Sequence, residues 1–381
     1  MSNYKNYFQD FIKENPELLH LAGHSHHYWP DITKLAIQEA YQDASKHVDL
    51  KWNKIFGEVV PKTQEIIAKI INFDHPEWIA FAPNTHELLC RVLSTFPMKK
   101  EIRILTSKHE FHSARRQLQR MAEEDQVTVD WVETSEIESK LKENQYDLIY
   151  LSHVFFDSGL VLEQETIKKI IELKNNALFL LDGYHSFCAI PVDIKAFQDD
   201  LFYLAGSYKY AQAGEGLCFM TVPKDCPLRP RNTGWFASFE TLEEKTDQVA
   251  YSPNGNRFNG ATRDFTPHYR FNKIWEMYES DQLSIADISE HIKELQNEFI
   301  KHLSSSAKAK LICTDVKKLG HFLTFQCQSH QEAKLLYEEL LNEQILTDFR
   351  DTSLRFGFGM YLDSSDIQKL SHKIQKIPFF Q

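Results

Sequence analysis

Short apolar runs alternate with amphipathic stretches from about residue 78 to residue 220, and this alternation limits the fold more than any other feature of the chain. The runs lack the strict apolar–polar alternation of half-solvated strands, and stretches with helical periodicity separate them. Both properties are typical of a parallel sheet covered by helices on both faces. We therefore predict an α/β fold with a mostly parallel, seven-stranded sheet. The predicted strands are Trp78–Ala82, Ile102–Thr106, Val127–Val132, Leu148–Ser152, Leu178–Leu181, Leu201–Ala205 and Leu217–Val222, with helices at 85–95, 112–123, 135–143 and 163–175.

The segments on either side of this region complete the predicted organisation. Residues 31–71 have helical periodicity, and the pattern changes again after about residue 250. A long helical region at 268–305 precedes strand-like segments at 311–314, 321–327, 346–349 and 354–358, with helices at 330–343 and from Asp363. We expect residues 31–255 to form a large domain and 256–381 a smaller α+β domain. Residues 1–30 are expected to pack with the small domain.

The composition disfavours several classes of partner. The 381 residues carry a net charge of −11, which argues against nucleic acid or an anionic membrane. No apolar run reaches the ~18 residues of a membrane helix, and the first residues lack the apolar core of a signal peptide. We therefore predict a cytoplasmic protein. Its six cysteines are scattered without a CxxC pair, which is typical of reduced thiols.

A histidine-rich run, His24-Ser25-His26-His27, raises the alternative of a metal protein. No acidic residue or cysteine at ligand spacing accompanies the run, so we predict no metal site. Elemental analysis of the purified chain tests this alternative.

A lysine and an aspartate that follow two predicted strands are the main indication of function. Lys209 lies just after the run Leu201–Gly206, and Asp182 ends the run that begins at Ala177. Ligands of such sheets bind beyond the carboxyl ends of the strands, where both side chains would lie. Pyridoxal phosphate (PLP) needs a lysine for its Schiff base and an acid that keeps its pyridine nitrogen protonated. We predict that Lys209 and Asp182 have these roles, with His185 hydrogen-bonded to the aspartate or to the 3-oxygen side of the ring.

Two further segments follow predicted strands and open predicted helices. In APNTHE, the Thr85 hydroxyl and the backbone N–H groups of a helix N-terminus provide a natural phosphate site. Asn84 is expected to cap the same helix, to contact the phosphate, or both. In KHEFHS, Phe111 is placed to stack on the cofactor ring.

Several strings resemble those of one enzyme family. In SYKY, Tyr208 precedes the lysine as in kynureninases, and GWFASF resembles their Gly-Trp-Phe segment, with Trp235 at the position that reaches the cofactor phosphate. In RFNGATRDF, Thr262 resembles the threonine that arrives from the neighbouring subunit in class V enzymes. DFRDTSLRFGFGMY is close to a family string whose second arginine, here Arg355, binds the substrate α-carboxylate. Over roughly residues 18 to 370 the chain is similar to fold-type I PLP enzymes of the class V aminotransferase superfamily, and within them to kynureninase.

This resemblance implies a reaction and a partner. Kynureninases cleave the Cβ–Cγ bond of L-kynurenine or 3-hydroxykynurenine hydrolytically in tryptophan catabolism, giving alanine and an anthranilate. Lys209 would then take the Cα proton, and Tyr208 would act as general acid and base. A homodimer is implied, with Thr262 acting across the interface. The segment LAGHSHHYWPD departs from the family's Gly-Asn-Ser-Leu-Gly type motif at the substrate end of the site, where we expect His26 to bind substrate.

Other functions remain open on the same scaffold. Transamination and a β-lyase step use the same lysine and cofactor. A cysteine desulfurase is disfavoured, because its nucleophilic cysteine needs a mobile, small-residue loop, whereas Cys327 lies in a strand-like segment and Cys313 follows an apolar pair. A PLP-binding or purely structural protein without turnover is the last alternative, and the joint presence of Lys209, Asp182 and Arg355 argues against it.

Overall fold

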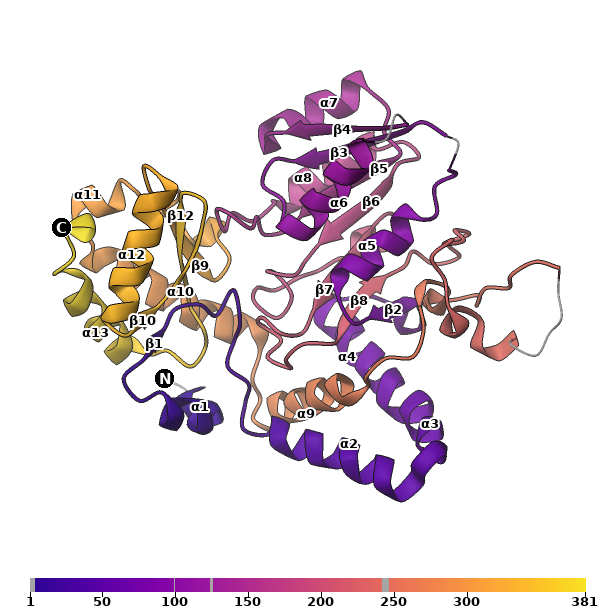
Figure 1. The fold of residues 1–381 in the computed structure, drawn as a ribbon, viewed down its shortest axis with the longest axis horizontal. Coiled ribbons are helices and arrows are strands. Elements are labelled where there is room, and N and C mark those ends of the chain that lie inside the picture. The colour runs from indigo at the N-terminus through magenta and orange to yellow at the C-terminus, as the bar shows by residue number, and fades with distance from the viewer. Residues whose placement is uncertain (1–3, 99, 124–125, 242–246) are drawn as a thin grey trace.

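A seven-stranded sheet is the centre of the computed structural model, which describes residues 4–98, 100–123, 126–241 and 247–381 (Figure 1). The strand order is β2-β8-β7-β6-β5-β3-β4, and β8 alone runs in the direction opposite to the other six strands. The predicted mostly parallel sheet is confirmed. The strands are β2 (Ile79–Ala82), β3 (Ile102–Ser107), β4 (Val127–Val132), β5 (Leu148–Ser152), β6 (Leu178–Asp182), β7 (Phe202–Gly206) and β8 (Cys218–Thr221).

Helices surround this sheet, and one of them begins with a side-chain cap. The helix α5 (Thr85–Leu93) packs on β2, β7 and β8, and Asn84 caps it by accepting a hydrogen bond from the Glu87 N–H at 2.9 Å. Three more helices follow β3, β4 and β5 in the chain, namely α6 (His112–Ala122), α7 (Ile137–Glu143) and α8 (Gln164–Leu173). Apart from the edge strand β4, the strands of this sheet are almost completely buried, as expected for a sheet covered on both faces.

A group of helices below the sheet joins distant parts of the sequence (Figure 1). It contains α2 (Thr33–His47), α3 (Lys51–Lys54), a π-helical turn (Ile55–Val59), α4 (Val60–Ile71) and α9 (Thr266–Ser280). The Tyr269 hydroxyl of α9 donates to Asp43 of α2 at 2.9 Å, and Thr63 of α4 contacts Asn272 of α9. The helix that follows residue 255 therefore packs with the N-terminal helices, and the position of the domain boundary stays a prediction.

A smaller three-stranded antiparallel sheet lies beside the large one (Figure 1). Its order is β11 (Asp348–Arg350), β12 (Ser353–Gly357) and β9 (Phe322–Gln326). The strand β1 (Leu19–His20) pairs in parallel with β10 (Ile345–Leu346), so a segment near the N-terminus lies against the C-terminal part of the chain. The helices of this region are α1 (Gln9–Glu14), α10 (Ile285–His302), α11 (Ser305–Lys308), α12 (His330–Asn342) and α13 (Ser364–Ile374).

The C-terminal elements differ in detail from the prediction. The helical region at 268–305 is two helices, because Gln282 takes a left-handed conformation with φ of 54° and Ser284 caps α10. The segment 311–314 forms only an isolated bridge, between Leu311 and Phe325. The strand predicted at 346–349 is divided between β10 and β11. In the described ranges, no helix is long and apolar enough to cross a membrane.

Candidate active site

A cavity of about 310 Å³ opens at the carboxyl ends of the central strands, where ligands of such sheets bind. The pairing of Ser152 with Asp182, and of Asp182 with Leu204, aligns the ends of β5, β6 and β7 there. The volume lies at the lower end of the range for small-molecule sites. The lining residues are Pro83, Asn84, Thr85, His86, Phe111, Ser113, Ser152, Val154, Phe156, Asp182, Tyr184, His185, Tyr208, Lys209, Glu215 and Gly216.

Lys209 is the cationic side chain that enters this cavity, in the loop between β7 and β8. Its Nζ lies 2.6 Å from His185 Nε2, and the rings of Tyr184, Tyr208 and Phe111 lie 5.0, 5.8 and 5.7 Å from the nitrogen. Burial, followed by the positive charge of Arg355, lowers the pKa of Lys209 to about 7. The lysine can therefore act as a neutral amine, the form that attacks an aldehyde and accepts a proton.

Asp182 lies at the end of β6 with both carboxylate oxygens hydrogen-bonded. The Tyr150 hydroxyl donates to Oδ2 at 2.6 Å, and the Tyr184 backbone N–H donates to Oδ1 at 2.9 Å. These contacts fix the orientation of the carboxylate, whereas burial raises the pKa of Asp182 above its usual value. A positively charged ring nitrogen placed beside the carboxylate would offset this cost of burial.

The predicted phosphate and ring-stacking residues line the same cavity. Asn84 and Thr85 are at its edge, at the N-terminus of the nine-residue helix α5. Phe111 also lines it, 5.1 Å from the ring of Phe156 in an edge-on arrangement. A buried lysine, an oriented carboxylate, a helix N-terminus and a flat aromatic side chain thus surround one space, and together they fit PLP.

Four of the predicted residues do not reach the cavity wall. Arg355 is 1% exposed, and the ring of Phe156 lies between its guanidinium and the cavity, 4.3 Å from the guanidinium carbon. Trp235 Nε1 donates to Thr262 Oγ1 at 3.2 Å, and both side chains are exposed outside the cavity lining. His26 is also exposed and stacks on Tyr208, which does line the cavity, with ring centroids 4.9 Å apart.

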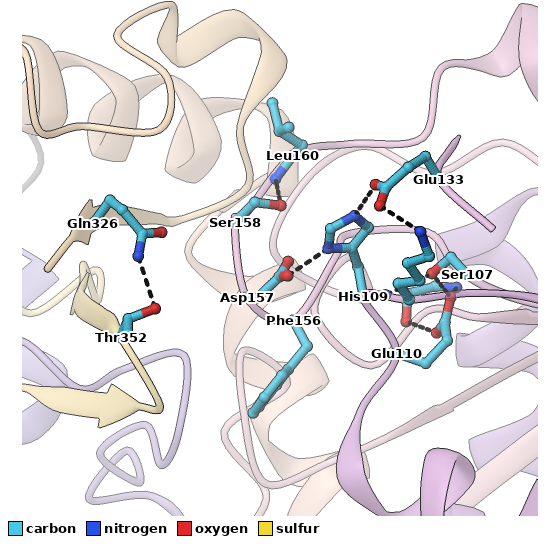
Figure 2. A network of polar contacts seen from close by, with 12 residues as sticks. Ser107, His109, Glu110, Glu133, Phe156, Asp157, Ser158, Leu160, Gln326 and Thr352 are labelled. Atoms are coloured by element: carbon cyan, nitrogen blue, oxygen red, sulfur yellow. Dashed lines mark hydrogen bonds and ion pairs between the residues drawn. The ribbon is translucent and has the colours of Figure 1, made fainter. Parts of the chain in front are cut away.

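The structure adds residues that sequence reasoning missed. Phe156 follows β5 in the string HVFFDSG, and Figure 2 shows the polar contacts of its neighbour Asp157. His109 Nδ1 lies 2.5 Å from Asp157, and its Nε2 lies 2.9 Å from Glu133. The buried Glu110 carboxylate accepts hydrogen bonds from the Ser107 hydroxyl at 2.6 Å and from the Ser152 hydroxyl at 2.5 Å. The position of this segment after a predicted strand is the signal that could have found it.

The comparisons with known proteins identify the family and the fold of the chain. The family model of the class V aminotransferases matches residues 32–370, so the chain belongs to this PLP-dependent family. It is 24% identical to the uncharacterized aminotransferase YcbU of Bacillus subtilis over 273 residues, which are 68% of each chain. It is 26% identical to the cysteine desulfurase IscS of Shewanella baltica over 173 residues, which cover 43% of this chain and only 42% of that protein.

Solved structures show the same fold at low sequence identity. A mutant of C-DES with glycine covalently linked to its PLP cofactor matches with a TM-score of 0.83 and 16% identity, over 98% of this chain and 99% of that one. The complex of the same protein, described as a cystine C–S lyase, with its product cysteine persulfide matches with a TM-score of 0.80. That match has 16% identity and covers 95% of this chain and 98% of that one. The cofactor of this chain is PLP, as the sequence predicted.

Proposed function

We propose that this protein is a PLP-dependent enzyme that cleaves a bond at the β-carbon of a free α-amino acid. The observation that carries the proposal is the buried Lys209 amine, which lines the cavity 2.6 Å from His185 beside the oriented Asp182. L-Kynurenine, cleaved at Cβ–Cγ to alanine and anthranilate, is one substrate candidate because of the motifs around Lys209 and Arg355. A cystine-like disulfide amino acid is the other, because of the likeness to C-DES.

The residues of the chain have separate roles in this reaction. When bound, PLP supplies a ring that accepts the charge developing at Cα. The Lys209 amine takes the Cα proton and holds it at Nζ. Because its pKa is about 7, the amine is deprotonated, and therefore able to accept the proton, in a large part of the molecules at neutral pH. Asp182 compensates the positive charge of the ring nitrogen. Burial raises the pKa of the Tyr208 hydroxyl to about 12, so this group stays protonated and can deliver a proton to the leaving part of the substrate.

The cysteines argue against a desulfurase mechanism with sulfur carried on the protein. None of the residues that line the cavity is a cysteine. Cys218 lies behind Tyr184, 3.5 Å from its hydroxyl, and burial raises the pKa of its thiol to about 12. A thiol in this state is a poor nucleophile. Bond cleavage that releases its products directly is therefore the better match to this cavity.

We also propose a homodimer in which Trp235 and Thr262 complete the phosphate end of the partner's cavity. Both are exposed in a single chain, and Trp235 is 41% exposed despite its size. Phe239 next to it is 45% exposed, so this surface carries unusual apolar area. Analytical ultracentrifugation tests the proposal, since a monomer at micromolar concentration would contradict it. A cytoplasmic location stays a prediction from the sequence.

The proposed reaction is tested with PLP-loaded protein, L-kynurenine and L-cystine in parallel. Anthranilate fluorescence reports the first substrate, and pyruvate with released persulfide reports the second. Lys209→Ala should lose both activities and the visible absorbance of the lysine-bound cofactor, whereas Lys224→Ala, at an exposed lysine outside the cavity, should keep them. Amino-group transfer to a keto acid, without product from either substrate, would show an aminotransferase instead. Turnover by Lys209→Ala would end the proposal.

A further inference from the structure

A second carboxylate of the active-site cavity, that of Glu215, takes no part in the proposed reaction. Among the described residues that line the cavity, Asp182 and Glu215 are the acidic ones, and Asp182 compensates the ring nitrogen of the cofactor. The Glu215 side chain is 60% exposed, whereas Asp182 is buried at the end of its strand. Glu215 therefore lies at the mouth of the cavity, where it meets the end of a ligand that points toward solvent.

The backbone that carries Glu215 is held in one conformation. The glycines on either side of it have positive φ angles, 69° at Gly214 and 96° at Gly216, which residues with a side chain rarely adopt. From α9, Arg270 donates one hydrogen bond to the Ala213 carbonyl at 2.6 Å and another to the Glu215 carbonyl at 2.8 Å. A fixed loop thus presents the Glu215 carboxylate to the cavity.

The histidine-rich run near the N-terminus lies beside this carboxylate. His26 Nε2 is 3.6 Å from Glu215 Oε1, and the His26 ring stacks on Tyr208 with centroids 4.9 Å apart. The backbone of the run contacts the same tyrosine, because the His27 N–H donates to the Tyr208 carbonyl at 3.4 Å. A carboxylate has about four acceptor positions, so the contact with His26 leaves positions for a donor from a ligand.

The charge of Glu215 distinguishes ligands by their distal end. It attracts an ammonium or amino group, which can also donate a hydrogen bond to it, and it repels a distal carboxylate. An apolar end gains nothing from the contact. The phosphate of bound PLP adds negative charge to the same cavity and therefore strengthens this preference.

We propose that Glu215 selects substrates whose distal end carries an amino or ammonium group, and that it excludes α-amino acids with an acidic side chain. The inference rests on the proposed function, since it assumes that a free amino acid reacts at Lys209. L-Kynurenine ends in an aromatic amino group and L-cystine in a second ammonium group, so both substrate candidates carry the required donor. Glu215 determines specificity in this way and exchanges no proton with the substrate.

Three amino acids of similar length, titrated into the PLP-loaded protein, test the inference. Nε,Nε-Dimethyl-L-lysine ends in a protonated tertiary amine, which cannot itself form a Schiff base. L-2-Aminoadipate ends in a carboxylate, and L-norleucine ends in a methyl group and is the uncharged reference. The change in cofactor absorbance gives the apparent dissociation constant of each. We expect the wild type to bind dimethyl-lysine more tightly than aminoadipate.

The variant Glu215→Gln keeps the size of the side chain and removes its charge. It should weaken dimethyl-lysine about fivefold, the effect of losing one partly exposed charge pair, and strengthen aminoadipate by a similar factor. The affinity for norleucine should not change. The matched control Glu77→Gln, which removes the same charge at an exposed residue outside the cavity lining, should alter none of the three constants.

The possible failures of the inference and of the proposed function are distinct. Unchanged relative affinities for the three amino acids in Glu215→Gln, or an equal weakening of all three, would overturn the role of Glu215. Tighter binding of aminoadipate than of dimethyl-lysine by the wild type would also overturn it. No spectral response of the wild type to these amino acids, to L-kynurenine or to L-cystine would overturn the proposed function itself.

Discussion

A substitution of His109 tests whether charge on one histidine fixes the segment that carries Phe156. His109 contacts Asp157 and Glu133 through its two ring nitrogens (Figure 2). The hydrogen bond with Asp157 is the largest cause that raises the pKa of His109, opposed by burial and reinforced by Glu133, to about 9. His109→Gln removes the charge and keeps a polar side chain of similar length.

The size of the effect follows from this pKa. A rise of the His109 pKa from 6.5 to about 9 means that protonation of this side chain stabilises the folded state by at most roughly 3 kcal/mol. The side chains of His109, Asp157 and Glu133 are 32, 35 and 47% exposed, so solvent screening reduces this to about 1–2 kcal/mol. The pKa is higher in the folded protein than in the unfolded chain. This stabilisation is therefore fully present below pH 6.5 and is lost as the pH rises through about 9.

Urea unfolding of wild type and His109→Gln at about pH 6 and about pH 10 measures this difference. We expect the variant to be less stable by about 1–2 kcal/mol at the lower pH and nearly equal at the higher one. His372→Gln, an exposed histidine on α13, should show no such dependence. A stability difference for His109→Gln that is constant across this range, or that increases with pH, would refute the electrostatic reasoning.

Three other changes have defined outcomes. Gly183→Ala would place a Cβ 2.1 Å from the Tyr203 ring, and should lower the free energy of unfolding by about 1–3 kcal/mol in urea titrations. Burial raises the pKa of Glu110 to about 7, because the protonated carboxyl is favoured in the folded protein. The contribution of this group to stability is therefore fully present below pH 4.5 and is lost as the pH rises through about 7. Glu110→Gln should therefore gain stability relative to wild type between about pH 5 and about pH 8, and a loss over that range would contradict this assignment. Tyr208→Phe should keep PLP affinity in equilibrium dialysis while product release falls by about 10²–10⁴-fold, and an unchanged rate would remove the hydroxyl from proton transfer.

The large sheet could be predicted because most of its strands are buried on both faces. Such strands are continuous apolar runs, and for one of them, Leu148–Ser152, the predicted and observed bounds coincide. The bounds of the partly exposed edge strand Val127–Val132 coincide as well. The break between α9 and α10 was missed because apolar periodicity continues across it. There the left-handed conformation of Gln282 and the cap at Ser284 end one helix and start the next. The turn is a local backbone property, which the periodicity of side chains does not report.

The part of the site that follows strand ends was predictable for the same reason. Asp182, Thr85 and Phe111 line one cavity because parallel strands end at one edge of the sheet, whatever the details of the loops. His24 could not be placed in this way, because its position depends on the pairing of residue 22 with residue 357. The strand-end rule finds the segment of Phe156 but not its contact with β12, in which the Phe156 carbonyl accepts a hydrogen bond from Arg355. Such pairings join segments far apart in the sequence, and no short motif encodes them.

Arg355 is an intermediate case, because its partner is encoded nearby. The string DFRDTSLRF contains two extended runs joined at Asp351-Thr352, and Asp351 has the positive φ of 49° expected in a tight turn. A hairpin closed there places Asp348 directly opposite Arg355, which is the observed register. Opposite charges at such cross-strand positions pair. The spacing of the acid and the arginine about the turn is therefore sufficient to predict that Asp348 holds the Arg355 guanidinium in place.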